Sequence, residues 1–345
     1  MDEADRRGLF RRVLDSALWR TGFHLERLTP ERRRSFESSH DPRIALPAGA
    51  EKYLHSDNPR LLELRHAYAA FGLPVCTDSF YWNPDRMKRN VDLRWFRGDN
   101  AYVWQYRQLG ADLRFKRYIA WREVQAKDTR GLIQKLGEDG MFGCWVERHA
   151  DSVPISRDLL DSVSEINFLD RHLKLFDRPQ LRVLDIGAGY GRLAYRMSRA
   201  LPNLVRYDCI DAVPESTFLC EYYLDYRKVA PPARAVPLHL IDSELVPGNY
   251  DLALNIHSFP ECTYAAISWW ISRVKSLRIP WLMIAPNHRD HLLSTEADGS
   301  RRDFSSLVHD AGYELSAKEL MYDNPAAREL IEVHDDCQML FRLRT

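Results

Sequence analysis

The sequence predicts a doubly wound α/β domain with a mostly parallel sheet, preceded by a mainly helical region. The first observation is the stretch 182–192, RVLDIGAGYGR, in which a buried strand leads into a glycine turn and then a helix. The second is the alternation of strand and helix patterns that follows residue 179. The third is a pair of strand patterns at the end of the chain, which suits a seven-stranded sheet closed by an antiparallel strand.

Short apolar runs place the strands of this domain. They are expected at 182–186, 204–211, 235–241, 250–256 and 280–286, with closing strands at 314–322 and 336–344. Helical patterns fall between them at 191–200, 215–226, 263–277 and 300–311. Alternation over this length implies a parallel sheet with right-handed crossovers.

The chain before residue 160 carries helical and aromatic-rich patterns instead. A charged helix is expected at 2–34, a helix capped by Asn58 at 58–71, and an amphipathic helix at 156–176. Aromatic residues crowd the segment 80–121. We therefore divide the chain into a helical cap or substrate region, 1–160, and a Rossmann-like cofactor domain, 161–345.

Composition and charge argue against several classes of function. The chain has 345 residues, 45% of them hydrophobic, and its 49 basic and 49 acidic side chains give a formal net charge of zero. Without a basic excess, neither nucleic acid nor an anionic membrane is an expected partner. Apolar runs are too short to span a membrane, and the six cysteines form no C-x-x-C pair. We expect a cytoplasmic protein with reduced thiols.

The spacing of the glycine turn discriminates between nucleotide ligands. Gly187, Gly189 and Gly191 form G-x-G-x-G, whereas a dinucleotide pyrophosphate needs G-x-G-x-x-G, which opposes an NAD enzyme. Asp185 before the turn would repel a phosphate but suits the ammonium of an amino acid. A nucleoside that carries an amino acid is S-adenosylmethionine (SAM). The pattern, with Ala188 inside the turn, resembles motif I of class I SAM-dependent methyltransferases; Gly187 and Gly189 would leave room for the methionine part.

Further cofactor contacts are expected at the carboxyl ends of the next strands, where open α/β sheets bind ligands. Asp211, followed by Ala212, lies about 20 residues beyond the turn and is placed to accept both ribose hydroxyls. Asp208 is a weaker candidate because it comes earlier in the strand. Asp242 and Ser243, after the third strand, could bind the adenine edge or simply cap the next loop.

The end of the fourth strand is where an acceptor would meet the sulfonium of SAM. Asn255 is expected to contact the cofactor there. His257 is the best-placed general base for a hydroxyl acceptor, although a loop histidine in a structural hydrogen bond is an equal alternative. Glu261 is a second catalytic candidate, or only an acid that favours the start of the following helix.

Several segments outside the glycine turn resemble the sugar O-methyltransferase family of bacteria. They are 96–107 (FRGDNAYVWQYR), 138–143 (EDGMFG), 156–161 (SRDLLD), 257–261 (HSFPE) and 340–342 (LFR). The resemblance runs from about residue 58 to the C-terminus. It implies a helical cap over a class I core, SAM as cofactor and a hydroxyl of a sugar or glycosylated metabolite as acceptor. It also implies that Asn100, Tyr102 and Gln105 face SAM from the cap.

Competing functions remain open to different degrees. An N-methyltransferase or an aromatic O-methyltransferase would share the fold, and a free amine needs no strong base. A non-catalytic partner protein with this fold is opposed by the intact Asp185, glycine turn and Asp211. A nucleic-acid enzyme is opposed by the lack of an Asn-Pro-Pro-Tyr motif after the fourth strand. The His-rich stretches 287–291 and 334–336 match no tight metal spacing, so no metal is expected, and a homodimer stays open.

Overall fold

The structure is a computed structural model that describes residues 46–72, 79–98, 102, 113–149, 152–333 and 335–344. The expected helix at 2–34 lies outside the described residues, and so do Asn100 and Gln105. Within the described part, no helix is long and apolar enough to cross a membrane.

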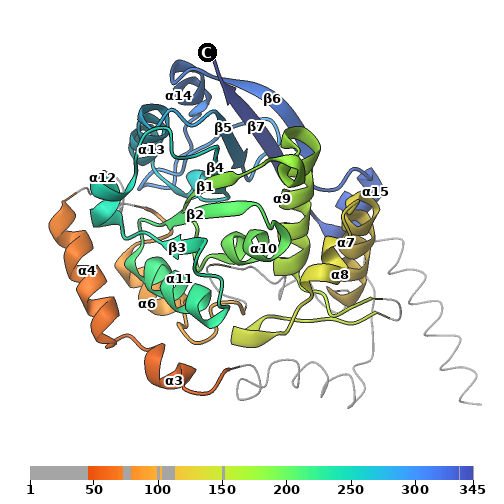
Figure 1. Cartoon of the computed structure of the whole chain (residues 1–345), viewed down its shortest axis with the longest axis horizontal. Helices are drawn as coiled ribbons and strands as arrows, with labels where there is room; N and C mark the ends of the chain where they lie inside the picture. The colour runs from red at the N-terminus through yellow and green to blue at the C-terminus, as the bar shows by residue number, and fades with distance from the viewer. Residues whose placement is uncertain are drawn as a thin grey trace, which may run out of the picture.

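The described strands form one seven-stranded sheet in the order β3-β2-β1-β4-β5-β7-β6 (Figure 1). Its pairs are parallel except that β7 runs antiparallel to both β5 and β6. This order with an antiparallel β7 is the class I methyltransferase fold, so the fold prediction is confirmed. The strands are β1 (Leu181–Ile186), β2 (Leu204–Ile210), β3 (Ala233–Ala235), β4 (Leu252–Ile256), β5 (Trp281–Ala285), β6 (Tyr313–Leu320) and β7 (Cys337–Leu343).

Helices precede the sheet in the chain and alternate with its strands. The helices before β1 are α3 (Ala50–Tyr53), α4 (Pro59–Phe71), α6 (Pro84–Asn90), α7 (Leu113–Lys127), α8 (Leu132–Leu136) and α9 (Arg157–Leu173). Those after β1 are α10 (Arg192–Ala200), α11 (Pro214–Tyr226), α12 (Ile241–Glu244), α13 (Tyr264–Ser276), α14 (Ser305–Asp310) and α15 (Pro325–Ile331). Short 3-10 turns are η2 (Met141–Gly143), η3 (Leu175–Asp177), η4 (Leu238–Leu240) and η5 (Phe259–Glu261).

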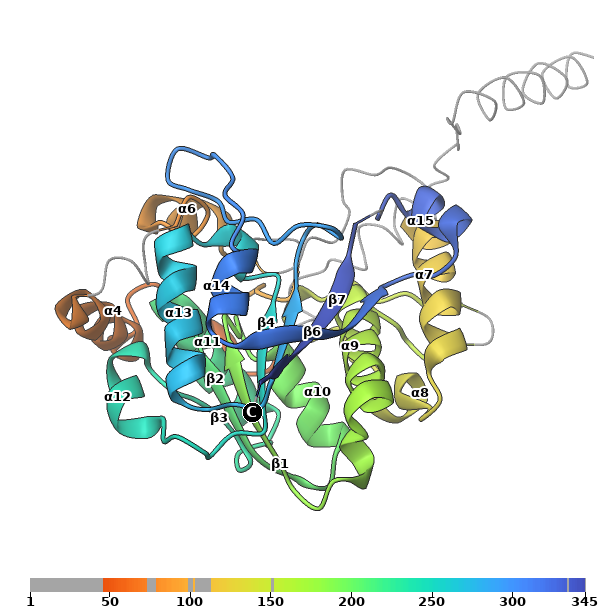
Figure 2. The same ribbon diagram turned by 90° about the horizontal axis from the view of Figure 1, so that it is seen from above.

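The two faces of β1 pack in two separate hydrophobic clusters. Val183 belongs to a cluster with α9 and α10, whereas Leu184 and Ile186 belong to a cluster with α13. Figure 2 shows α9 and α10 on one side of the sheet and α13 and α14 on the other. Because side chains alternate along a strand, β1 is apolar on both faces and lies in the middle of the molecule.

Two of the expected elements are wrong in extent. The strand expected at 235–241 ends at Ala235, because Pro237 cannot donate to a ladder and the chain turns into η4 and α12. The helix expected at 300–311 begins only at Ser305; the chain before it makes an isolated bridge between Leu293 and Asp303.

The helices of the N-terminal region flank the sheet rather than forming a separate layer. α4 packs along α11, where Arg60 forms an ion pair with Glu221 (Nη2–Oε1 2.6 Å), and α7 packs against α9 and α15 (Figure 1). The predicted division at residue 160 falls inside α9, which contacts α7 and α10 alike. The two-domain division therefore stays a prediction.

Candidate functional site

A cavity of about 620 Å³ lies beyond the carboxyl ends of the parallel strands. Its walls come from the loops that follow β1, β2, β4 and β5, from Trp82 and Tyr102 of the N-terminal region, from the start of α9, and from Glu332, Val333, Asp335 and Asp336 before β7. The chain leaves β1 toward β2 on one side and leaves β4 toward β5 on the other. The cavity therefore lies at the switch in strand order, where this class of sheet binds ligands.

Asp185 is buried at the end of β1 and lines the cavity. Its Oδ2 accepts a hydrogen bond from the Tyr207 hydroxyl at 2.7 Å. Burial raises the pKa of Asp185 to about 7, although the hydrogen bond from Tyr207 acts in the opposite direction. No described side chain forms an ion pair with Asp185, so the cavity holds a carboxylate that a cationic ligand group would stabilise.

The glycines of the turn are required by the protein's own packing. All three have positive φ, which a side chain rarely adopts. A Cβ at Gly187 would lie 2.1 Å from the Ser258 Oγ, and one at Gly191 would lie 2.9 Å from the Cys220 Sγ. The expectation that Gly187 leaves room for methionine is thus corrected, because Ser258 occupies that space. Gly191 is not part of the cavity wall, whereas Gly187, Ala188 and Gly189 are.

Asp211 joins the loops after β1 and β2. Its Oδ2 accepts from the Gly189 amide at 2.9 Å and its Oδ1 from the Val213 amide at 2.8 Å. Burial raises the pKa of Asp211 to about 6, and these two hydrogen bonds oppose the rise. Both Asp211 and Ala212 line the cavity. Spare lone pairs on both oxygens can still accept hydroxyl groups.

Asp208, the weaker ribose candidate, is a structural residue. It is fully buried and binds Arg206 (2.7 Å), Arg234 (2.8 Å) and the Tyr250 hydroxyl (2.5 Å). It lies outside the cavity wall.

Three further predicted cofactor residues do not reach the cavity. Asp242 and Ser243 are on α12 instead of a strand end; Asp242 pairs with Arg273 at 2.6 Å. Asn255 is fully buried: its amide donates to the Ile186 carbonyl at 2.9 Å and its oxygen accepts from the Phe259 amide at 2.8 Å. Asn255 therefore joins the ends of β1 and β4 by hydrogen bonds but does not line the cavity.

His257 lines the cavity immediately after β4. Its φ is 60°, and its amide donates to the Ala285 carbonyl at 2.9 Å. The ring Nδ1 lies 2.7 Å from the Oδ1 of Asn287, a residue that follows β5 and also lines the cavity. This position therefore fits both roles considered for His257, a loop histidine in a structural hydrogen bond and a general base.

Glu261 lines the same cavity at the end of η5. Its Oε2 accepts a hydrogen bond from the Trp82 indole at 2.6 Å, and its carbonyl accepts from the Ser79 hydroxyl at 2.8 Å. Burial raises the pKa of Glu261 to about 7, against the hydrogen bond from Trp82. Trp82 in turn packs on Tyr102, with ring centroids 5.3 Å apart. Tyr102 lines the cavity, and its contact with SAM stays a prediction.

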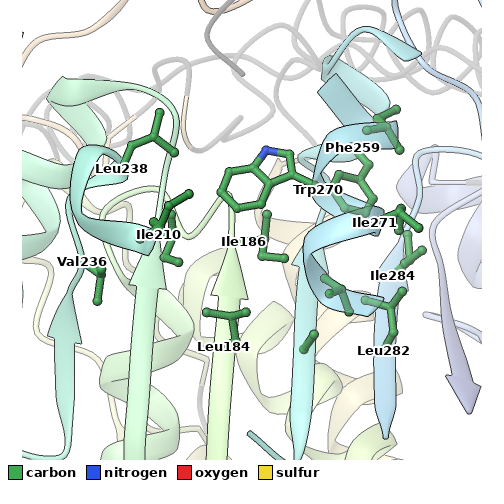
Figure 3. Packing of buried hydrophobic residues seen from close by; sticks show 14 of the residues in the cluster. Leu184, Ile186, Ile210, Val236, Leu238, Phe259, Trp270, Ile271, Leu282 and Ile284 are labelled. Atoms are coloured by element: carbon green, nitrogen blue, oxygen red, sulfur yellow. The ribbon is translucent and has the colours of Figure 1, made fainter. Parts of the chain in front are cut away.

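Some cavity residues were not singled out from the sequence. Trp270 sits on α13 at a position whose apolar pattern is that of ordinary core; in Figure 3 its indole lies above Ile186, between Ile210 and Phe259. Asn287 follows β5, and a search of that strand end for polar side chains would have found it.

Three of the segments quoted for the family resemblance meet in one buried ion network. Arg97, fully buried, binds Glu138 (2.8 Å) and Asp158 (3.1 Å), and Arg196 of α10 binds the same two carboxylates (2.8 and 3.0 Å). Burial would raise the pKa of Asp158, but the two guanidiniums hold it well below its usual range. Tyr190 of the glycine turn donates to Asp158, so the network supports the cavity wall.

Within the described ranges, no group of three His, Cys, Asp or Glu side chains is arranged to hold a metal ion. The expectation that no metal is needed stays a prediction.

A scan against protein-family models and a search of curated proteins find no match. Several solved structures are similar. The [4+2]-cyclase SpnF has 12% identity over 66% of this chain and 97% of its own, with a TM-score of 0.41. Magnesium protoporphyrin IX methyltransferase from Synechocystis, with bound SAM, has 11% identity over 66% and 97%, with a TM-score of 0.40. A SAM-dependent methyltransferase from Leishmania major has 17% identity over 52% and 73%, with a TM-score of 0.38. At these values the activity of this chain has to be argued from its own residues.

Proposed function

We propose that the chain is a SAM-dependent methyltransferase that acts on a hydroxyl of a sugar or a glycosylated small metabolite. The observation that carries the proposal is that the ends of β1, β2 and β4 bring Asp185, Asp211 and His257 to one cavity. Its volume of about 620 Å³ is in the range of small-molecule sites.

The residues of one half of the cavity fit SAM. Asp185 would hold the ammonium group, whose charge would offset the cost of burying that carboxylate. Asp211 would accept the ribose hydroxyls, and Ala212, Val213 and Trp270 offer apolar surface to the adenine. Tyr102 would close over Gly189, since its ring lies 3.4 Å from where a Cβ of Gly189 would be. When bound, SAM supplies an activated methyl group.

The other half of the cavity fits the acceptor. A hydroxyl must lose its proton as it attacks, and His257 is placed to take it. Glu261 is a second group with this capacity, because its raised pKa of about 7 is near neutral pH. The protein would hold the acceptor oxygen in line with the methyl group, and the rings of Trp82 and Tyr102 would exclude water.

A saccharide is supported by the way Trp82 is held. The Glu261 carboxylate fixes the indole through its N–H group, which leaves the aromatic ring in the cavity wall. An indole ring offers a flat apolar surface, which suits the face of a sugar, and a neighbouring carboxylate can accept sugar hydroxyls.

An amine acceptor is the second candidate, favoured by the charge of the cavity. Glu261, Asp335 and Asp336 line it, and none of the three forms an ion pair with another described residue. An ammonium group would be attracted to them. An amine needs no strong base once deprotonated, so removal of the His257 ring separates the two candidates.

Calorimetric titration with S-adenosylhomocysteine, SAM and NAD tests the cofactor assignment. We expect heat from the first two ligands and none from NAD. The Asp242→Ala variant is the control. Its carboxylate lies outside the cavity, so its removal should leave the affinity for these ligands at the wild-type value. Binding of NAD without binding of S-adenosylhomocysteine would refute the proposal. Methyl transfer from labelled SAM to panels of sugars, glycosides and amines then identifies the acceptor class.

A further inference from the structure

We propose that Asn287 is a positioning residue that sets the tautomer of His257, so that the Nε2 atom is the one that accepts a proton. The inference rests on the proposed function, because it assigns a role within the same cavity. It concerns a residue outside the segments that the sequence predicts to bind the cofactor or the acceptor.

The register of two neighbouring strands places the pair. Ile256 of β4 pairs with Ala285 of β5 at the end of the parallel ladder. The His257 amide then donates to the Ala285 carbonyl at 2.9 Å, so the hydrogen-bonded contact continues beyond the last paired residue. Asn287 comes two residues after Ala285 and leaves the sheet at the same edge. Both side chains therefore enter the cavity from adjacent strand ends.

The backbone of His257 is held in an unusual conformation. Its φ of 60° lies in the left-handed region, which costs a non-glycine residue of order 1 kcal/mol or more. Strain of this kind persists where the surroundings fix it, and it clusters at functional sites. Here the amide bond to Ala285 and the ring bond to Asn287 fix the residue from two sides.

The hydrogen bond determines where the ring proton lies. The Oδ1 of Asn287 faces the Nδ1 of His257 at 2.7 Å, and because a carbonyl oxygen can only accept, this pairing requires the hydrogen on Nδ1. In the neutral ring the lone pair is then on Nε2, which makes no hydrogen bond with the described residues. Unconstrained histidine in water favours the opposite tautomer. An aspartate at this position would fix the same tautomer, but its negative charge would also make the ring hold its second proton more tightly. An asparagine fixes the tautomer without that effect.

The other charged groups that line the cavity are carboxylates and two arginines, Arg157 and Arg192. Glu165 of α9 acts on His257 electrostatically but is bound to Arg192 of α10 at 2.7 Å. Glu261, after β4, and the pair Asp335 and Asp336, before β7, face the same cavity. None of these groups forms a hydrogen bond with the His257 ring, so Asn287 is its hydrogen-bond partner among the described residues.

Nitrogen-15 NMR of the imidazole rings tests this directly, with S-adenosylhomocysteine as the bound probe. We compare the wild type with Asn287→Leu and Asn287→Asp, and use His291→Leu as a control from the same loop and outside the cavity wall. In its neutral form, the His257 ring should show the Nδ1–H tautomer in the wild type and in the control. Asn287→Leu should shift it toward Nε2–H, and Asn287→Asp should move the deprotonation of the ring to higher pH.

Two outcomes would overturn the proposal. One is an Nε2–H ring in the wild type, and the other is identical shifts in the wild type and Asn287→Leu. Binding of S-adenosylhomocysteine is measured on the same samples, so a failure of the cofactor assignment is seen separately.

Turnover of the identified acceptor provides the second readout. Asn287→Leu should lower kcat by about 10-fold, a part of the general-base contribution, with KM for SAM unchanged. Asn287→Asp should recover most of kcat but only at higher pH. A loss of kcat without any change of pH profile in Asn287→Asp would indicate a merely structural role and would contradict the proposal.

Discussion

Asp185 is a residue whose burial is unfavourable for the free protein and favourable for a complex with a cation. Its pKa rises from an ordinary 3.8 to about 7 in the folded chain. A carboxyl with a raised pKa holds its proton more tightly when folded, so its contribution to stability is complete below pH 4 and is lost as the pH rises through 7. The same ionised group is what an ammonium group would bind.

Asp185→Asn should therefore stabilise the free protein and weaken the complex. The amide keeps an oxygen for Tyr207 to donate to and removes the cost of ionisation, so we expect a higher Tm at pH 8, a smaller rise at pH 5 and little change below pH 4. The affinity for S-adenosylhomocysteine should fall, and in the wild type it should increase as the pH rises through about 7. Melting curves and calorimetry at several pH values measure both. Asp242→Asn, exposed and paired with Arg273, is the control; an equal rise in Tm at both pH values would contradict the argument.

Asp211→Ala should weaken cofactor binding by roughly 2–4 kcal/mol, because a charged acceptor for two hydroxyls is lost. The structure adds a second cost, since the Gly189 and Val213 amides lose their partner as well. A modest loss of stability of about 1–2 kcal/mol is therefore expected. Titration of S-adenosylhomocysteine and chemical denaturation separate the two effects. An unchanged dissociation constant would mean that the ribose is bound elsewhere.

His257→Ala should lower kcat for a hydroxyl acceptor by about 10²–10⁴ and leave SAM affinity nearly unchanged. Glu261→Gln is the companion variant, since its amide cannot take the proton but can still bind the Trp82 indole through its oxygen. The larger effect identifies the base. Full turnover by well-folded His257→Ala protein would assign the proton transfer to Glu261 or point to an amine acceptor.

At the scale of elements, the glycine turn after β1 and the turn after β4 are mutually dependent. The Ser258 side chain lies where a Cβ of Gly187 would be, so a change in one turn displaces the other. The packing of the cofactor half of the cavity therefore depends on the packing of the acceptor half.

Gly187→Ala should destabilise the fold by more than the 1–2 kcal/mol of a left-handed alanine, because it also clashes with Ser258. Ser258→Gly should recover the part due to the clash. Gly248→Ala is the matched control for backbone strain alone: its φ of 79° is similar and nothing lies within 4 Å of its Cβ position. Denaturation of the three single variants and the double variant measures the coupling. Additive effects would show that Ser258 moves aside at no cost.

The sequence could predict the sheet, the glycine turn and the strand ends because each depends on residues close together in the chain. Asp185 lies next to the last residue of β1, and Asp211 and His257 directly follow β2 and β4, strands whose ends the apolar pattern marks. Asp242 does not lie at a strand end as predicted, because Pro237 ends the third strand earlier than the apolar pattern indicates. Trp82 and Trp270 could not be assigned, since they reach the cavity only through contacts between distant segments.

At the scale of the whole molecule, the ion network around Arg97 joins the N-terminal region to the cofactor side. Arg97 and Glu138 lie before α9, Asp158 is on it, and Arg196 is on α10. These charges are buried, so each depends on the others for compensation.

Arg97→Leu should destabilise the protein by about 3–5 kcal/mol, because it leaves buried carboxylates short of a partner. Arg94→Leu, which breaks only the exposed pair with Asp92, is the control and should cost less than about 1 kcal/mol. Chemical denaturation monitored by tryptophan fluorescence measures both. Equal stabilities of the two variants would show that Arg196 alone compensates the network.

The same network bears on how this chain could be re-engineered. A cap exchanged at residue 160 would remove Arg97, Glu138 and Asp158 together and leave Arg196 as an isolated charge in the interior. Grafting the front half of another enzyme onto this core should therefore yield insoluble chimeras unless position 196 is made apolar as well. Acceptor preference in such a protein would instead be changed by substitutions in the cavity wall that leave this ion network intact.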